Sequence, residues 1–175
     1  ALALARFIKL LSRPTIEILG KVDGFPGLHS LERHEKGQAI PRLLLFRFNA
    51  PITFFNAPYF KREITKVIEE AGTDLRHVVL DLLPVSTIDA TGLLTLVELA
   101  EALGVRGISF NAAGRATEWH RWAQARGFEQ RHIRLFPTLR QAVHDLSADR
   151  GSQIEKGGAI IHHAMSTSDA EQTEQ

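Results

Sequence analysis

The sequence predicts an α/β fold built on a mainly parallel sheet of four to five strands with helices around it. From residue 43 onward, apolar runs of strand length alternate with helical patterns of about 10 to 15 residues, which is typical of right-handed βαβ units. Residues 78–82, V-V-L-D-L, are almost continuously apolar, as in a strand that is covered on both faces. With 175 residues, 44% of them hydrophobic, the chain can bury one core without a metal or a disulfide.

The individual elements follow from local patterns. Strands are expected at residues 15–22, 43–48, 78–82, 107–112 and 133–136. Helices are expected at residues 57–70, 93–103, 115–126 and 138–146. The first three of these helices are expected to end at Gly72, Gly104 and Gly127. Residues 23–41 are rich in Gly and Pro and should form an irregular loop, whereas residues 52–55 should continue the second strand beyond Pro51.

The two ends of the chain differ from this domain. Residues 1–14 combine helically spaced apolar residues with cations and stop at Pro14, which predicts an amphipathic basic helix. Such a helix either packs on the domain or connects it to a membrane. The polar residues 149–175 predict a flexible tail, so the predicted domain spans residues 15–148. The only methionine is Met165, and we therefore expect a piece of a longer protein.

Composition argues against several classes of function. The 21 basic and 20 acidic residues give a net charge of +1, so there is no global attraction to nucleic acid, and none is expected as a partner. The absence of cysteine removes thiol nucleophiles, disulfides and Cys-ligated metals. No apolar stretch approaches the roughly 18 residues of a membrane span, so the fragment itself is expected to be soluble.

No motif of a known enzyme class occurs. A P-loop, a G-x-G-x-x-G fingerprint, a G-x-S-x-G elbow and an H-E-x-x-H pair are all missing from the sequence. The histidines are scattered apart from His162-His163 in the polar tail, so no metal site is expected. Asp81 and Asp89 flank one strand-to-helix connection, but neither has a positioned base or lysine. We therefore predict no catalytic residue and no enzymatic activity.

The most informative segment is the turn of residues 84–92, P-V-S-T-I-D-A-T-G, before the most apolar helix. Its Asp, Thr and Gly residues suit a helix start, where a side-chain oxygen accepts an unpaired N–H group. The same N–H groups can bind an anion or a phosphate at the open end of a parallel sheet. Both interpretations stay open. The binding site would consist of Ser86, Thr87, Asp89, Ala90, Thr91 and Gly92, with residues 111–115, and Arg115 in particular, at the neighbouring strand end.

A family resemblance is carried by these residues. Residues 78–97, V-V-L-D-L-L-P-V-S-T-I-D-A-T-G-L-L-T-L-V, resemble the central motif of STAS domains, which sulfate transporters share with anti-sigma-factor antagonists. Residues 41–62, P-R-L-L-L-F-R-F-N-A-P-I-T-F-F-N-A-P-Y-F-K-R, resemble the entry to the STAS domain of SulP-type anion transporters. The likeness covers about residues 14–147. It implies a STAS-like, antisigma-factor-antagonist-like fold.

The resemblance also implies a function. The chain would be the cytoplasmic regulatory domain of a bacterial SulP-type secondary anion (sulfate or bicarbonate) transporter, at the inner face of the inner membrane. Its partners would be the transmembrane part of its own transporter, a second copy in a homodimer, or a regulatory protein, and residues 1–14 would be the juxtamembrane connector. In antagonists of the family, a partner kinase phosphorylates the serine before this glycine. The matching residue is Thr91, with Asp89 as the nearby acid.

Two alternatives belong to other classes. One is a free-standing phospho-switch resembling anti-sigma-factor antagonists, and the other is a nucleotide-binding module that takes a guanine nucleotide at the turn and Arg115. Trp119 and Trp122, spaced i and i+3, are expected to be buried against the sheet, or else to form a docking patch. Phe54 and Phe55 are expected mostly in the core, although the edge near Pro58 could contact a membrane portion.

Overall fold

The computed structural model describes residues 6, 12–124 and 133–148. The strands in this part of the chain are β1 (Ile16–Val22), β2 (Phe25–Ser30), β3 (Gly37–Gln38), β4 (Leu43–Phe48), β5 (His77–Asp81), β6 (Ser109–Ala113) and β7 (Arg134–Phe136). The helices are the short 3₁₀ turn η1 (Leu31–Arg33), α2 (Ala57–Glu70), α3 (Ala90–Val105), α4 (Ala116–Gln124) and α5 (Leu139–Ala148). The predicted alternation of strands and helices is therefore confirmed.

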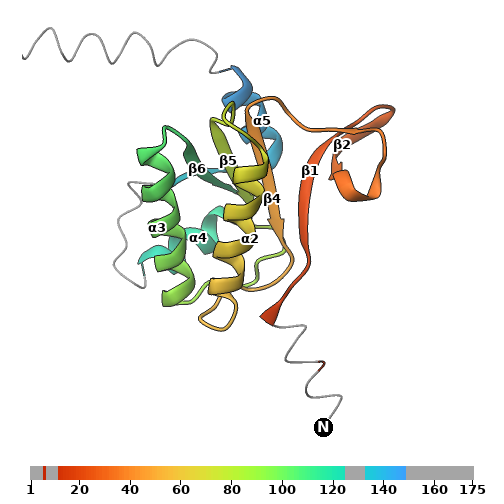
Figure 1. Ribbon diagram of the computed structural model, residues 1–175. Helices are drawn as coiled ribbons and strands as arrows, with labels where there is room; N and C mark the ends of the chain where they lie inside the picture. Colours follow the sequence, from red (N-terminus) through yellow and green to blue (C-terminus); the bar gives the residue numbers. More distant parts are fainter. Residues whose placement is uncertain (1–5, 7–11, 125–132, 149–175) are drawn as a thin grey trace, which may run out of the picture.

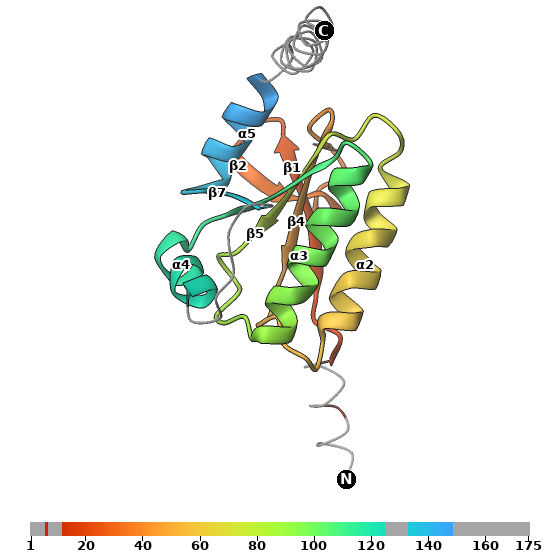
Figure 2. The ribbon, with the colours of Figure 1, turned by 90° about the vertical axis from the view of Figure 1, so that its left-hand side faces the viewer.

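All seven described strands form one mixed sheet, in the order β2-β1-β4-β5-β6-β7, with β3 also paired to β1. Strands β4 to β7 run parallel, and β1 is antiparallel to its neighbours β2, β3 and β4. The parallel strands are joined through helices, as right-handed βαβ crossovers require. In two views, α2 and α3 lie on one face of the sheet and α5 lies on the other (Figure 1, Figure 2).

Alternate residues of the central strands fill two separate cores. On the side of α2 and α3, Phe46, Leu80 and Phe110 are at most 2% exposed. On the opposite side, Leu45 and Val79 are fully buried in a smaller cluster that α5 closes with its own apolar side chains. Since successive strand residues point to opposite faces, a strand covered on both sides needs the continuous apolar run that the sequence shows.

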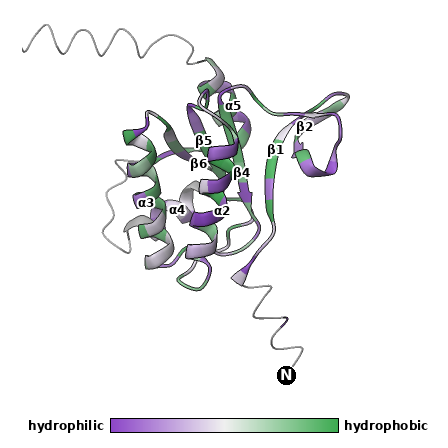
Figure 3. Cartoon of the chain, in the orientation of Figure 1, coloured by the Kyte–Doolittle hydropathy of each residue, from purple (hydrophilic) through white to green (hydrophobic). Residues whose placement is uncertain are grey.

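Helices α2 and α3 bury their faces differently. Helix α2 alternates apolar and polar side chains and turns Phe60, Ile64 and Ile68 to the sheet, whereas α3 is apolar along most of its length (Figure 3). The ring of Phe60 meets the rings of Phe46 and Phe48 edge to face, at centroid distances of 5.8 and 5.2 Å. Such pairs add about 0.5–1.5 kcal/mol each beyond the burial of apolar area.

Three expectations about individual segments were wrong. Part of the expected loop 23–41 forms a β-hairpin on β1, which raises the strand number to seven in the described part of the chain. Residues 52–55 do not extend β4, because only Ile52 pairs, and it pairs with Ile88. Helix α3 continues past Gly104 to Val105, and Gly107, with φ of +72°, makes the reversal that only glycine adopts easily.

The chain enters the sheet beside the carboxyl end of β4, where the Asn49 amide donates to the Thr15 carbonyl at 3.0 Å. Helices α2 and α3 begin at this same end of the sheet (Figure 1). The predicted connector helix of residues 1–14 and the predicted tail of residues 149–175 lie almost wholly outside the described residues, as does Gly127. The domain boundaries therefore stay predictions.

Replacing Phe60 by alanine should lower the free energy of unfolding by about 3–5 kcal/mol, because a fully buried ring and two edge-to-face contacts are lost. Urea unfolding followed by far-UV circular dichroism measures this change. Phe54→Ala is the matched control, since its ring is 69% exposed, and it should change stability by less than about 0.5 kcal/mol. Equal effects of the two substitutions would contradict the packing described.

Candidate functional site

Asp89 ties the turn after β5 to a segment far away in the chain. Its Oδ1 accepts a hydrogen bond from the Gly92 amide at 2.7 Å, which caps the first turn of α3. Its Oδ2 accepts from the Phe54 amide at 2.8 Å. A carboxylate at this position also interacts favourably with the positive end of the helix dipole. The predicted helix cap is confirmed, and the same side chain holds the loop that precedes α2.

The two segments also meet through their backbones. The Ile52 amide donates to the Thr87 carbonyl at 3.0 Å, and the Asp89 amide donates to the Ile52 carbonyl at 3.1 Å. Gly92 packs so closely on this bridge that a Cβ added to it would lie 2.3 Å from the Ile52 carbonyl oxygen. Only glycine fits there. The D-A-T-G sequence is thus explained by packing as well as by capping.

The outer side of this turn is polar and accessible. Ser86, Thr87, Ala90 and Thr91 are all exposed, whereas Gly92 is buried. The Thr91 carbonyl accepts from the Thr95 hydroxyl at 2.8 Å, but the Thr91 hydroxyl makes no hydrogen bond within the described residues. A hydroxyl in this position can be reached by solvent or by a modifying enzyme.

Exposed apolar side chains flank the turn. Phe54 is 69% exposed, Phe55 45% and Leu94 48%, which corrects the expectation that both phenylalanines belong to the core. The two phenylalanines lie in the loop that the Phe54 amide attaches to Asp89. Nearby, burial raises the pKa of the Tyr59 phenol, and the carboxylate of Glu63 raises it further, so this hydroxyl is neutral at physiological pH.

Arg115 reaches the beginning of the turn and not its helical end. Its Nε donates to the Leu83 carbonyl at 3.0 Å, and its Nη1 lies 3.6 Å from Glu118 Oε1. Its backbone has φ of +46°, a left-handed conformation that directs the side chain back toward β5. Asn111 does not face the turn at all, because it is 2% exposed and donates to the Val78 carbonyl at 3.1 Å. Of the predicted anion-site residues, the structure groups Ser86 to Gly92 and places Arg115 beside Leu83.

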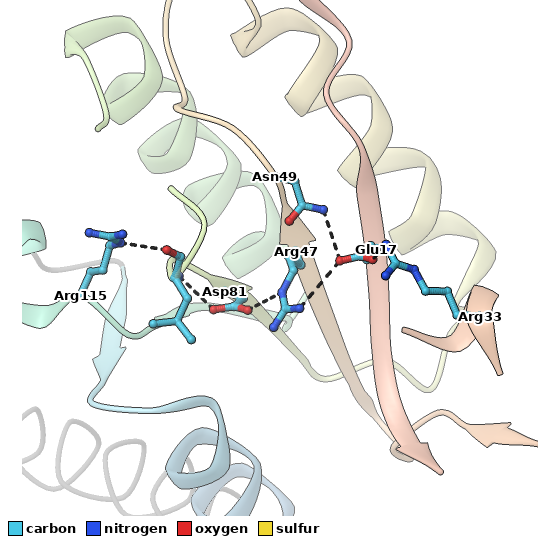
Figure 4. Close-up of polar contacts among 7 residues, drawn as sticks. Glu17, Arg33, Arg47, Asn49, Asp81 and Arg115 are labelled. Atoms are coloured by element: carbon cyan, nitrogen blue, oxygen red, sulfur yellow. Dashed lines mark hydrogen bonds and ion pairs between the residues drawn. The ribbon is translucent and has the colours of Figure 1, made fainter. Parts of the chain in front are cut away.

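A row of three charged side chains, two buried acids and a partly exposed arginine, crosses the sheet next to this turn, and sequence reasoning missed it. Glu17, Arg47 and Asp81 are direct neighbours on β1, β4 and β5. Arg47 Nε donates to Asp81 Oδ2 at 2.7 Å, and Arg47 Nη1 lies 3.8 Å from Glu17 Oε2 (Figure 4). Arg33 and Asn49 also contact Glu17, at 2.7 and 3.2 Å. The sequence feature that could have revealed this row is one charged residue, Arg47 or Asp81, within each of the otherwise largely apolar strands L-L-L-F-R-F and H-V-V-L-D.

The row gives Asp81 a structural role. Its side chain is fully buried, and its Oδ1 accepts from the Leu83 amide at 3.0 Å. Asp81 and Asp89 therefore have different partners and do not form a carboxylate pair. Trp119 and Trp122 are 2% and 9% exposed and join the core of α2 and α3, so the prediction that they are buried is confirmed.

No helix within residues 6, 12–124 and 133–148 has both the length and the apolar character that a bilayer crossing requires. Within the same residues, no three His, Asp or Glu side chains are placed to share a metal ion.

Comparison with protein families identifies the fold. The family model of the STAS domain matches residues 36–142, which is more than half of the chain and includes the capped turn. The chain belongs to the STAS domain family.

Sequence relatives of this STAS domain are transporters. A protein of Mycobacterium tuberculosis named as a probable sulfate transporter is 29% identical over 113 residues, covering 65% of this chain and 20% of the relative. High affinity sulfate transporter 2 of Stylosanthes hamata is 26% identical over 121 residues, covering 65% and 18%. The chain thus spans about a fifth of the length of these curated relatives.

Solved structures agree on the fold. The murine Slc26a9 anion transporter superposes with a TM-score of 0.72 at 16% identity, over 84% of this chain and 24% of that one. A sulfate transporter family protein from Wolinella succinogenes gives 0.52 at 18% identity, over 69% and 97%. An anti-sigma factor antagonist from Mycobacterium paratuberculosis gives 0.51 at 23% identity, over 81% and 100%. The expected STAS-like, antisigma-factor-antagonist-like fold is confirmed.

The close approach of Gly92 to Ile52 predicts opposite effects at two glycines of α3. Gly92→Ala should destabilise the domain by about 1–3 kcal/mol, since its Cβ meets backbone that cannot move freely. Gly104→Ala should stabilise it by about 0.5–1 kcal/mol, because nothing lies within 4 Å of the added Cβ. Thermal and urea unfolding measure both changes. A neutral Gly92→Ala variant would show that the two segments are not in contact.

Removing Arg47 leaves the fully buried Asp81 carboxylate without its partner. Arg47→Met should therefore cost about 3 kcal/mol of unfolding free energy. Combining it with Asp81→Leu should restore part of the loss, since the uncompensated charge is gone. Lys61→Met is the control, because its ion pair with Glu98 is half exposed and should matter by less than about 1 kcal/mol. Equal losses at Arg47 and Lys61 would be inconsistent with a buried pair.

Proposed function

We propose that the chain is the cytoplasmic, non-catalytic regulatory STAS domain of a bacterial SulP-type secondary anion transporter that moves sulfate or bicarbonate. The observation that carries this proposal is the match to sulfate transporters over only 18–20% of their length. The remaining four fifths of such relatives leaves room for a membrane part. The superposition on the murine Slc26a9 anion transporter supports the same arrangement at the level of fold.

The turn at the start of α3 is the regulatory point in this proposal. It combines an exposed hydroxyl at Thr91 with the exposed apolar side chains of Phe54, Phe55 and Leu94. Apolar side chains bordered by polar groups suit contact with another protein surface, here the membrane part of the transporter. The chain also enters the sheet at this end, through the Thr15–Asn49 hydrogen bond.

Phosphorylation of Thr91 would act there by electrostatics. It would add a charge of about −1.5 to −2 next to the Asp89 carboxylate, whose two oxygens already hold the Gly92 and Phe54 amides. The phosphate would therefore repel the Asp89 carboxylate. It could not bind the Gly92 and Phe54 amides, because these already donate to Asp89. The modified turn would hold the Phe54 loop less firmly and would present a more polar surface to its partner.

Anion uptake by the full-length transporter tests the proposal. Thr91→Glu should change the uptake rate by about fivefold or more at equal protein level in the membrane, whereas Thr91→Ala should block any regulation that depends on phosphorylation. Thr73→Glu is the matched control, because Thr73 is also exposed but lies in the turn before β5, at the opposite end of that strand. If Thr91→Glu and Thr73→Glu behave alike, and deletion of the domain alters neither uptake nor trafficking, the proposal is wrong.

A second candidate is a free-standing phospho-switch that binds a regulatory protein. The accessible Thr91 hydroxyl and the likeness of fold to an anti-sigma factor antagonist favour it. The coding sequence upstream of Ala1 separates the two candidates, since hydrophobic segments there support the transporter. A guanine nucleotide at the turn is a further proposal, in which Arg115 would keep its Nε on the Leu83 carbonyl and offer its other N–H donors to the nucleotide. Amide shifts near Thr91 and Arg115 on titration with GDP or GTP test it.

A further inference from the structure

We propose a second binding site on the opposite face of the sheet, a cavity that takes an organic anion with an apolar body. The cavity has a volume of about 720 Å³ and lies between the β1–β2 hairpin, the end of β4 and the first turns of α5. Its charged or titratable lining residues are Lys21, Arg47, Arg140 and His144. Its large apolar lining residues are Leu28, Leu83, Leu139 and Val143.

The cavity exists because α5 covers only part of its face. Helix α5 packs over β4, β5 and β7, where Ala142 and Leu146 close the smaller core. The hairpin side of the same face has no helix of its own among the described elements, as the two ribbon views show (Figure 1, Figure 2). The other face of the sheet is covered by α2 and α3, whose apolar side chains fill the larger core.

The charges that line the cavity are of one sign. No Asp or Glu is among its lining residues. The nearby acids are already engaged: Asp81 and Glu17 contact Arg47, and Asp145 contacts Gln141, His144 and Arg134. The hydrogen bonds from His144 and Gln141 lower the pKa of Asp145, and its carboxylate lies beside the lining residue His144, so Lys21 and Arg140 are the lining cations without a carboxylate partner among the described residues.

Two of the cations have no partner in the described part of the chain. Neither Lys21 nor Arg140 makes an ion pair or a hydrogen bond through its side chain there. Arg47 is fixed in direction, because Asp81 holds its Nε at 2.7 Å and Glu17 Oε2 lies 3.8 Å from its Nη1. A guanidinium has five N–H donors, so others of Arg47 can serve a ligand. Two unpaired cations beside one fixed guanidinium favour a carboxylate, sulfonate or phosphate group.

The apolar side chains that line the cavity favour a ligand whose anionic group is attached to an apolar body. Leu28, Leu139 and Val143 are half-buried and pack on the smaller core, and Leu83 is 60% exposed. A bare inorganic anion would leave these apolar side chains in contact with water, and a neutral hydrocarbon would leave Lys21 and Arg140 unused. A volume of about 720 Å³ is within the usual range for small-molecule sites, about 300–1,000 Å³.

Titrations of the isotope-labelled 175-residue chain, read by amide NMR shifts, test the site with three probes. Naphthoate carries both the charge and the apolar body, naphthamide only the body, and inorganic phosphate only the charge. Naphthoate should shift the amides of Lys21, Leu28, Leu139 and Arg140 in a saturable way at millimolar concentration. Naphthamide and phosphate should bind about tenfold more weakly or not at all.

Charge-neutralising variants complete the test. The double variant Lys21→Gln, Arg140→Gln should weaken naphthoate binding about tenfold or more, because both unpaired cations are lost. The matched control is Arg62→Gln, Lys66→Gln, which removes two exposed cations from α2 on the other face and should bind as the unaltered chain does. Binding that is equal in the two double variants would overturn the proposal. So would naphthamide binding as strongly as naphthoate, or shifts centred on Phe54 and Phe55.

Discussion

The carboxylate of Asp89 holds two backbone amides, that of Phe54, 35 residues away in the chain, and that of Gly92, 3 residues away. Through the first it fixes the loop before α2, and through the second it starts α3. The Ile52 carbonyl completes the junction, since it accepts from the Asp89 amide and lies against Gly92. Both helices on the main core therefore begin from one junction, and the exposed side chain of Thr91 lies beside it.

The two faces of the sheet are stabilised by different means. The face of α2 and α3 is apolar throughout, with Phe46, Leu80 and Phe110 in successive strands. The face of α5 is divided: its apolar half lies under α5, while Arg47 and Asp81 occupy the row where the parallel strands end. Buried ion pairs add little net stability but penalise every arrangement that separates them. A shift in register between β1, β4 and β5 would separate these charges and is therefore penalised.

Helices and strands in which apolar residues recur at a regular spacing could be predicted from the sequence. Segments whose structure depends on contacts with distant residues could not. The apolar run of β5 and the stripe of α2 specify their own structure. Ile52 appeared to extend β4, because nothing local shows that it bridges to Ile88. Arg115 was placed at the turn, but its left-handed backbone and its bond to Leu83 cannot be read from its neighbours in the chain. The hairpin that contains β2 was predicted to be an irregular loop, because Gly and Pro residues are typical of loops.

The Gly and Pro residues of β2 affect how the edge of the sheet can pair with another strand. Strand β2 lies at one end of the strand order, so one side of its backbone has no neighbouring strand in the described sheet. Pro26 lacks an amide hydrogen, and Gly27 has φ of +99°, outside extended geometry. An incoming strand would therefore meet an incomplete ladder at Pro26 and Gly27. The hairpin that resembles a loop in sequence is thus a poor template for edge-to-edge pairing with another strand.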